Sequence, residues 1–204
     1  HLVNFVFSLK QTGVPLGNAL GGALLPAAAL ALGWQGAALA VALICLALAL
    51  AVQPLRPTLD ADRQSGRAAL SRSHATTALR LVWESRPIRM LALISLTYSG
   101  MQVSLSAFLV TYLHDDLALG LVTAGFLLTA SQLAGVGGRL LWGVTADRFA
   151  APLKILGLLG LGMSAAALVT ASFTPGWPLA AMLAVCVAFG GTATAWNGVY
   201  LAQV

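Results

Sequence analysis

Four stretches of this 204-residue chain contain no Asp, Glu, Lys or Arg, and they limit what the chain can fold into. They cover residues 11–55, 90–114, 117–138 and 155–204. A helix needs roughly 20 residues to cross the hydrocarbon core of a bilayer, so the first and last stretches can each cross twice and the middle two once. Only 8% of the residues are charged, against about 25% in soluble domains. The chain is therefore predicted to be an all-α membrane protein with about six transmembrane helices.

Helices are predicted rather than barrel strands, because backbone groups in hydrocarbon must bond within their own segment and the runs lack the alternation of a barrel strand. Turn residues divide both long stretches, at residues 33–36 and 174–178, and each turn holds a tryptophan suited to the membrane interface. The predicted spans are residues 11–32, 35–53, 88–112, 118–141, 154–173 and 179–201.

The positive charge is distributed as a topology signal. The net charge is +5, and if the N-terminus is cytoplasmic all eleven Lys and Arg fall on the inner side. The predicted outer turns hold no Lys or Arg, and their ionisable residues are His114, Asp115 and Asp116. This bias predicts that both ends of the chain are cytoplasmic. It also explains the basic composition without nucleic acid, which is not expected as a partner.

A polar segment divides the chain into two parts. Residues 1–53 hold the first two spans, residues 54–87 form a basic cytoplasmic linker, and residues 88–204 hold the other four spans. The first residue is not Met and no tail follows the last span, so the chain is expected to be cut from a longer protein.

Within the linker, Leu79, Val82 and Trp83 lie at helical spacing, and Arg80 precedes Glu84 by four residues. This pattern is typical of a short amphipathic helix on the membrane surface. A disordered linker explains the composition equally well.

Catalytic and metal centres are not expected. The three His residues lie outside the predicted spans and no acid lies within one, so an intramembrane hydrolase lacks its nucleophile's base or its metal ligands. Cys45 and Cys186 are interpreted as apolar packing residues. The prediction is a protein that is not an enzyme and holds no cofactor or metal. A channel or a non-transporting membrane module is the alternative, although no charge ring or re-entrant segment is visible.

Small residues at four-residue spacing predict close helix packing in two spans. The rows are Gly13, Gly17 and Gly21 in the first span, and Ala130, Ala134 and Gly138 in the fourth, with Ser131 and Gly135 beside the second row.

The fourth span ends in a segment that combines glycine with charge, from Gly138 to Arg148. Gly143 is expected to allow a tight turn, and Asp147 can accept hydrogen bonds from the amides of a nearby helix N-terminus. Arg139 and Arg148 can pair with this acid or with lipid phosphate. A plain cytoplasmic loop that includes one acid explains the same residues.

With these residues the chain resembles the major facilitator superfamily, whose signature loop reads Gly, three residues, Asp, and Arg or Lys. Gly143, Asp147 and Arg148 match. The later basic pair is absent, as in the looser second copy after the family's eighth helix. Residues 10–17 look like the glycine-rich fifth helix and residues 195–200 like the tenth. The resemblance covers the whole chain, as helices five to ten.

The resemblance implies a secondary transporter of the bacterial cytoplasmic membrane, monomeric when complete, that moves a small solute by alternating access. It is either a uniporter or coupled to an ion through residues outside this chain. The third and sixth spans would line the substrate cavity, although hydrogen bonding between helices explains their polar residues equally well. The cavity candidates are Tyr98, Gln102, Ser104, Ser106, Thr192, Thr194, Trp196, Asn197 and Tyr200.

The resemblance also implies a conformational switch made of Gly138, Arg139, Gly143, Asp147 and Arg148. By the twofold relation of the halves, Asp147 is expected near residues 11–13, as a latch of the state closed to the cytoplasm.

Overall fold

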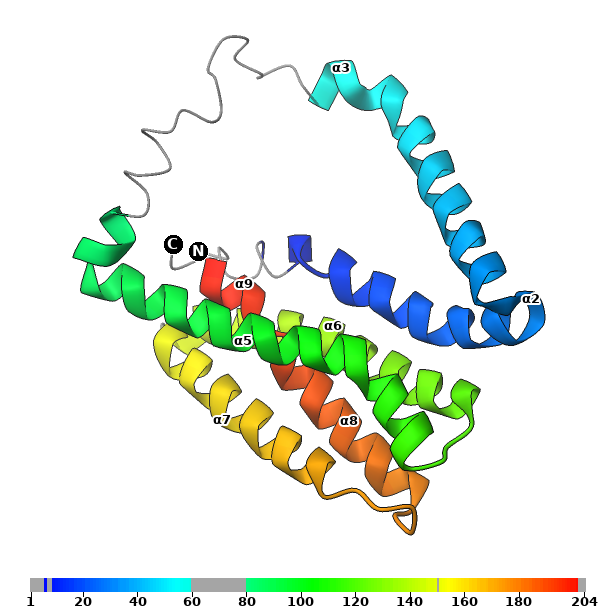
Figure 1. Cartoon of the computed structure of the whole chain (residues 1–204). Helices are drawn as coiled ribbons and strands as arrows, with labels where there is room; N and C mark the ends of the chain where they lie inside the picture. Colours follow the sequence, from blue (N-terminus) through cyan, green and yellow to red (C-terminus); the bar gives the residue numbers. More distant parts are fainter. Residues whose placement is uncertain (1–5, 7–8, 60–79, 150, 202–204) are drawn as a thin grey trace. The chain divides into compact units, whose positions relative to one another are not determined.

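A computed structural model describes residues 6, 9–59, 80–149 and 151–201. In these residues every regular element is helical, as the all-α prediction requires. The elements are α2 (Gly13–Val52), η1 (Gln53–Leu55), α3 (Arg56–Leu59), α5 (Arg86–Thr111), the π-helical η2 (Tyr112–Asp116), α6 (Leu121–Phe149), α7 (Pro152–Ala171), α8 (Leu179–Ala193) and α9 (Trp196–Leu201) (Figure 1).

The chain divides into two compact units, and the boundaries fall inside α2 and α5. One unit comprises His1–Ala27 and Ser95–Val204, and the other comprises Ala28–Ile94. The first unit contains α6 to α9 and the ends of α2 and α5 that contact them. All of the candidate switch and cavity residues lie in this first unit.

Five helices in the described part of the chain are long and apolar enough to cross a membrane. The first, Gly13–Leu55, has 43 residues, and at about 1.5 Å per residue it is roughly twice as long as the hydrocarbon core is thick. Gly33 interrupts it, with a positive φ of 74° and a ψ of 165° that glycine adopts without steric cost. The turn predicted at residues 33–36 is therefore present as a break, and the segment is long enough for two crossings.

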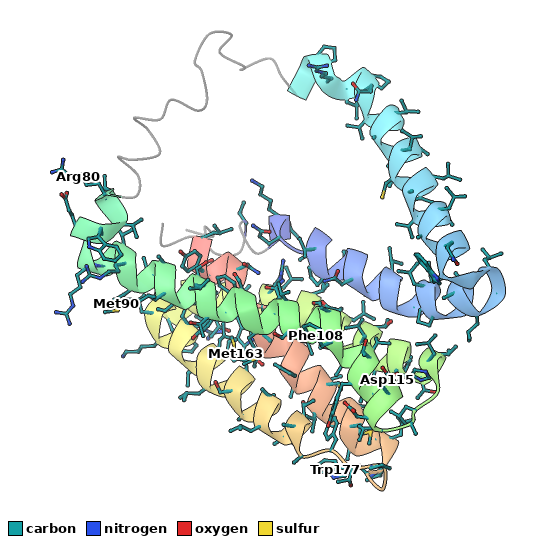
Figure 2. The ribbon with its side chains drawn as sticks, in the orientation of Figure 1. Arg80, Met90, Phe108, Asp115, Met163 and Trp177 are labelled. Carbon is teal, nitrogen blue, oxygen red and sulfur yellow. The ribbon has the colours of Figure 1, made fainter. Side chains whose placement is uncertain are left out.

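In the first unit, α6 and α8 make the most extensive contact between helices, followed by α7 and α8. The buried core includes Leu127 of α6, Leu159 and Met163 of α7, and Met182 of α8. Figure 2 shows Met163 in the interior of the bundle, and Asp115 and Trp177 near the connections at one end. On the outer face of α7, by contrast, Leu161 is 71% exposed and Leu168 74%. An apolar exterior around a packed apolar core fits a lipid environment.

The short helix predicted within the linker is present over the residues of that segment that the structure describes. Residues 80–84 are helical, and Arg80 Nε lies 2.6 Å from Glu84 Oε1. The side chains are exposed, so this i,i+4 pair contributes only about 0.3–0.5 kcal/mol. The rest of the predicted linker, including Leu79, lies outside the described residues.

The tight turn expected at Gly143 is wrong, because α6 continues as a helix to Phe149, beyond the span predicted at residues 118–141. A single glycine costs a helix only about 1 kcal/mol, and the first strong helix breaker is Pro152, at the start of α7. The sixth predicted span, residues 179–201, coincides with the candidate span Leu179–Leu201, and its helix is interrupted between α8 and α9.

Candidate functional site

The break between α8 and α9 has a local cause in the sequence. Thr192 and Thr194 follow two glycines, and their hydroxyls donate to backbone carbonyls of the preceding turn, Thr194 to Gly190 O at 2.9 Å. Such bonds bend helices, and glycines favour kinks. Ala195 N donates to Thr192 O at 3.4 Å instead of to Gly191 O, four residues back. The break therefore leaves carbonyl groups that need donors from elsewhere.

Two side chains of α6, three residues apart, supply these donors. Trp142 Nε1 donates to Gly191 O at 3.0 Å, and Arg139 Nε donates to Thr194 O at 2.6 Å. Positions three apart lie on the same helix face, so one face of α6 satisfies the carbonyls at the break.

The approach that permits these bonds depends on glycines on both helices. A Cβ added at Gly138 would lie 2.6 Å from Gly191 O, one at Gly135 would overlap Thr194 Oγ1, and one at Gly190 would overlap Ser131 O. The small-residue row predicted in the fourth span thus faces α8. In the first span a Cβ at Gly13 or Gly17 would meet no described atom within 4 Å, so close packing there stays a prediction.

Replacing Trp142 with phenylalanine is expected to destabilise the protein. The aromatic ring stays, but Gly191 O, a partly buried acceptor, loses its donor, which costs about 1 kcal/mol. The measurement is the unfolding temperature of the full-length protein in detergent. Trp83→Phe is the matched control, because the Trp83 side chain is 76% exposed. Equal unfolding temperatures for the two variants would show that the indole bond contributes nothing.

Arg139 is the most unusual residue of the predicted switch, because its side chain is completely buried. Besides its bond to Thr194 O, its Nη1 donates to Gln11 O, just before α2. Its Nη2 has no hydrogen-bond partner among the described residues. Of the switch residues in the last turns of α6, Gly143 is buried, Asp147 is partly buried and Arg148 is exposed.

Arg139 forms part of the wall of a cavity of about 210 Å³. Gln102 of α5 and Asn197 of α9 also line it, and Asn197 Nδ2 donates to Gln102 Oε1 at 2.9 Å. Two of the predicted cavity candidates are thus brought together across helices. The complete lining is Gln11, Val14, Ser99, Gln102, Val103, Arg139 and Asn197.

The aromatic candidates form a separate cluster that does not line this cavity. The rings of Tyr98 and Trp196 meet edge to face at 5.7 Å, and those of Trp196 and Tyr200 at 5.4 Å. Tyr98 donates its hydroxyl to Leu156 O at 2.7 Å, which connects α5 to α7. Trp196 is 2% exposed. These residues pack three helices together.

A polar group that the sequence analysis did not single out lies deeper between the helices. Gln132 of α6 is completely buried and donates to Ser106 Oγ of α5 at 3.0 Å, and Asn18 of α2 donates to the same oxygen at 3.4 Å. The rule that an amide in hydrocarbon needs a partner drew attention to Gln102, and it applies equally to Gln132. Of these three residues only Ser106 was a predicted candidate.

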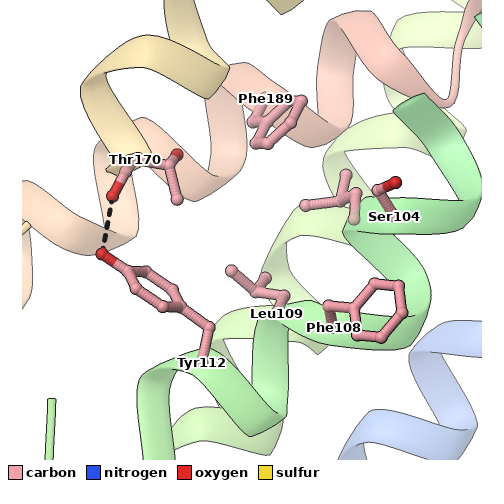
Figure 3. A pocket seen from close by; sticks show the side chains of 7 residues that line it. Ser104, Phe108, Leu109, Tyr112, Thr170 and Phe189 are labelled. Carbon is pink, nitrogen blue, oxygen red and sulfur yellow. Dashed lines mark hydrogen bonds between the residues drawn. The ribbon is translucent and has the colours of Figure 1, made fainter. Parts of the chain in front are cut away.

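A second cavity, of about 170 Å³, lies among α5, α7 and α8 and is almost entirely apolar. Figure 3 shows Phe108, Leu109 and Phe189 around it, with the Tyr112 hydroxyl directed at Thr170. Tyr112 donates to Thr170 O at 3.0 Å. Ser104, a predicted candidate, lines this cavity. Without a charged group, it offers a solute much less specificity than the cavity beside Arg139.

The sequence profile of the Major Facilitator Superfamily matches residues 2–204. Neither a search of curated proteins nor a search of solved structures found a match.

Proposed function

Since the chain belongs to the major facilitator superfamily of membrane transporters, we propose that it is part of a secondary active transporter that moves a small solute by alternating access. The observation that carries this proposal is the family match over residues 2–204. The apolar helices lie in the membrane. We place the protein in the bacterial cytoplasmic membrane, with both ends of this chain on the cytoplasmic side. In the complete protein we expect a monomer that either is a uniporter or takes a coupling ion.

In this proposal the start of α2 belongs to one half of the transporter, and α6, α8 and α9 belong to the other. The guanidinium of Arg139 then joins the two halves, because it donates to Gln11 O on one side and to Thr194 O on the other. Arg139 lies roughly 27 Å along α6 from Leu121 at about 1.5 Å per residue, close to the inner edge of a core about 30 Å thick. A polar link there must break when the halves separate on the cytoplasmic side.

Asp147 is proposed to hold the same state through helix amides near the start of α2. Replacing it with asparagine keeps the size and removes the charge, so transport should slow severalfold while expression stays intact. The measurement is initial uptake in cells that express the full-length protein at matched levels. Transport by Asp147→Asn at the parental rate would rule out the latch.

Solute counterflow tests the carrier proposal itself. The purified full-length protein is reconstituted into liposomes loaded with an unlabelled solute, and a labelled sample of the same solute is added outside at low concentration. A carrier accumulates the label transiently and saturates, whereas a pore only equilibrates it. Linear, non-saturating flux would show that the protein is a channel.

A further inference from the structure

The start of α5 carries an exposed surface that mixes cationic and apolar side chains. Residues 80–84 form a short helix that is separated from α5, which begins at Arg86. Pro87 has no N–H, so the carbonyl of Trp83, four residues earlier, lacks a helical donor. Arg89 Nη1 donates to Trp83 O at 2.8 Å instead. This bond places the Arg89 guanidinium beside the turn that holds Trp83.

The positive charge of this surface is not neutralised within it. Glu84 is the one acid among residues 80–94, and it is paired with Arg80 at 2.6 Å. Arg86 is exposed, and the hydrogen bond of Arg89 goes to a neutral carbonyl. Neither arginine makes an ion pair with a described residue. The two guanidinium groups, three residues apart on one helix face, therefore have charge and donors available to an anion.

Large apolar side chains are exposed on the same segment. Trp83 is 76% exposed, Leu81 53% and Met90 46%, and Figure 2 shows Met90 at this end of α5. A free anion would leave these side chains in water. In the headgroup region of a bilayer, by contrast, a tryptophan ring lies half solvated beside charged groups, and basic residues meet anionic lipids. The combination of tryptophan, apolar side chains and arginine therefore fits a lipid surface.

The length of the helix places the arginines at the level of the headgroups. The span that begins at Arg86 ends at Asp116 and has 31 residues, which is roughly 46 Å at about 1.5 Å per residue. The hydrocarbon core of a bilayer is about 30 Å thick, and the bilayer with its headgroup regions is about 40–45 Å thick. Both ends of the span therefore reach the headgroup regions.

We infer that Trp83, Arg86, Arg89 and Met90 form a docking surface for anionic phospholipids, with the two guanidinium groups on the lipid phosphate. A guanidinium binds phosphate oxygens through parallel N–H donors. A zwitterionic lipid brings its own cation beside the phosphate, where it competes with the arginines, so the surface favours a lipid with net negative charge. This inference goes beyond the proposed transport function and does not depend on it, because it requires only that the chain spans a membrane.

The test measures how anionic lipid stabilises the purified full-length protein in detergent. Phosphatidylglycerol or phosphatidylcholine with the same acyl chains is added at increasing mole fraction, and the unfolding temperature is recorded. Phosphatidylglycerol should reach half of its maximal effect at a mole fraction at least about fivefold lower, since one basic residue at a membrane surface contributes about that factor. Added salt should reduce the difference. Equal responses to the two lipids would overturn the inference.

The double variant Arg86→Gln, Arg89→Gln locates the effect, because glutamine removes each charge and keeps an N–H donor. The mole fraction of phosphatidylglycerol that gives half of the maximal effect should rise at least about tenfold, while the response to phosphatidylcholine stays the same. The two lipids are compared within each variant, so a change in basal stability does not affect the result. A double variant that keeps the parental preference would overturn the inference.

The matched control removes two exposed cations elsewhere, with Lys10→Gln and Lys154→Gln. Charges more than about 8–10 Å from the docked lipid are largely screened, so this variant should change the preference less than about twofold. An equal loss in the two double variants would show that the lipid responds to net charge alone, and the docking surface would be rejected.

Glycerol 3-phosphate distinguishes a lipid surface from a simple phosphate site. At the same ionic strength it should not reproduce the stabilisation, because it has no acyl chains to cover Trp83 and Met90. Stabilisation by glycerol 3-phosphate that the arginine variant loses would overturn the lipid assignment. Failure of solute counterflow would contradict the carrier and leave the lipid preference unaffected, so the two proposals fail independently.

Discussion

Replacing Gly190 with alanine is expected to prevent the normal packing of α8 against α6. The added methyl group would overlap the backbone carbonyl of Ser131, and a backbone atom cannot move aside as a side-chain end can. The two helices must separate along their contact, which is the most extensive in the bundle. The cost should reach about 3 kcal/mol or more, the upper end of the usual range for overpacking. The measurement is the unfolding temperature and the yield of monodisperse full-length protein in detergent.

Gly157→Ala provides the same chemical change where there is room for it. Gly157 lies in α7, and a Cβ added there would meet no atom of the described residues within 4 Å. Alanine is also a better helix former than glycine by about 1 kcal/mol, so this variant should be neutral or slightly stabilised. If the two substitutions have the same effect, the close contact of α6 with α8 does not determine stability.

Replacing Arg139 with methionine is expected to remove transport activity and leave the fold intact. Methionine fills much of the same volume, and it removes the desolvation cost of a buried charge that no acid neutralises among its hydrogen-bond partners. Against this, Gln11 O and Thr194 O lose their donors, at about 1–3 kcal/mol each. The two effects oppose each other, so the unfolding temperature should change less than in Gly190→Ala. Transport should fall at least about tenfold, because hydrogen bonds to charged groups contribute about 1.5–3 kcal/mol each.

Both quantities are measured on the same preparation, by counterflow in liposomes and by thermal unfolding in detergent. Arg139→Lys keeps the charge but loses the planar fork of donors, so it should recover only part of the activity. Lys154→Met is the control for loss of a cation from an exposed site. A variant Arg139→Met that transports normally would show that the guanidinium has no part in the cycle.

That the chain folds as a helical membrane protein could be predicted from the sequence alone, because the long stretches without charged residues can be read directly from it. The break at Gly33 was also predictable, since a span of more than 40 residues has to turn and glycine is the residue that turns it most easily. The family, too, was recognisable from the residues around Asp147.

The end of α6 was misjudged for a physical reason. The uncharged run stops at Gly138, and the span is predicted to end at residue 141, with a turn at Gly143. Helical hydrogen bonding does not stop where charge begins, however, and Arg139 is buried by the helices around it rather than exposed at a loop. Burial of a single side chain depends on its neighbours in space, which a sequence read along one helix does not provide.

The α8–α9 break was missed for a related reason. Gly190 and Gly191 are ordinary residues for a membrane span, and by themselves they do not indicate an interruption. The carbonyls at the break are satisfied by Arg139 and Trp142 of α6, which lie about 50 residues earlier in the chain. Donors on α6 thus satisfy backbone carbonyls at the interruption, as a bilayer requires.

The close crossing of α2 and α6 has a mechanical consequence. A Cβ on Gly22 would lie 3.0 Å from Gly125 O, so the helices touch backbone to backbone there, while the polar link between Arg139 and Gln11 lies further along the same pair. Gly125 and Arg139 are roughly 21 Å apart along α6 at about 1.5 Å per residue. With the glycine contact as a fulcrum, a tilt of about 15° would move the far ends roughly 5 Å apart over that lever arm. That displacement exceeds the reach of a hydrogen bond, so a small rotation suffices to open the end at Arg139 while the end at Gly125 stays in contact.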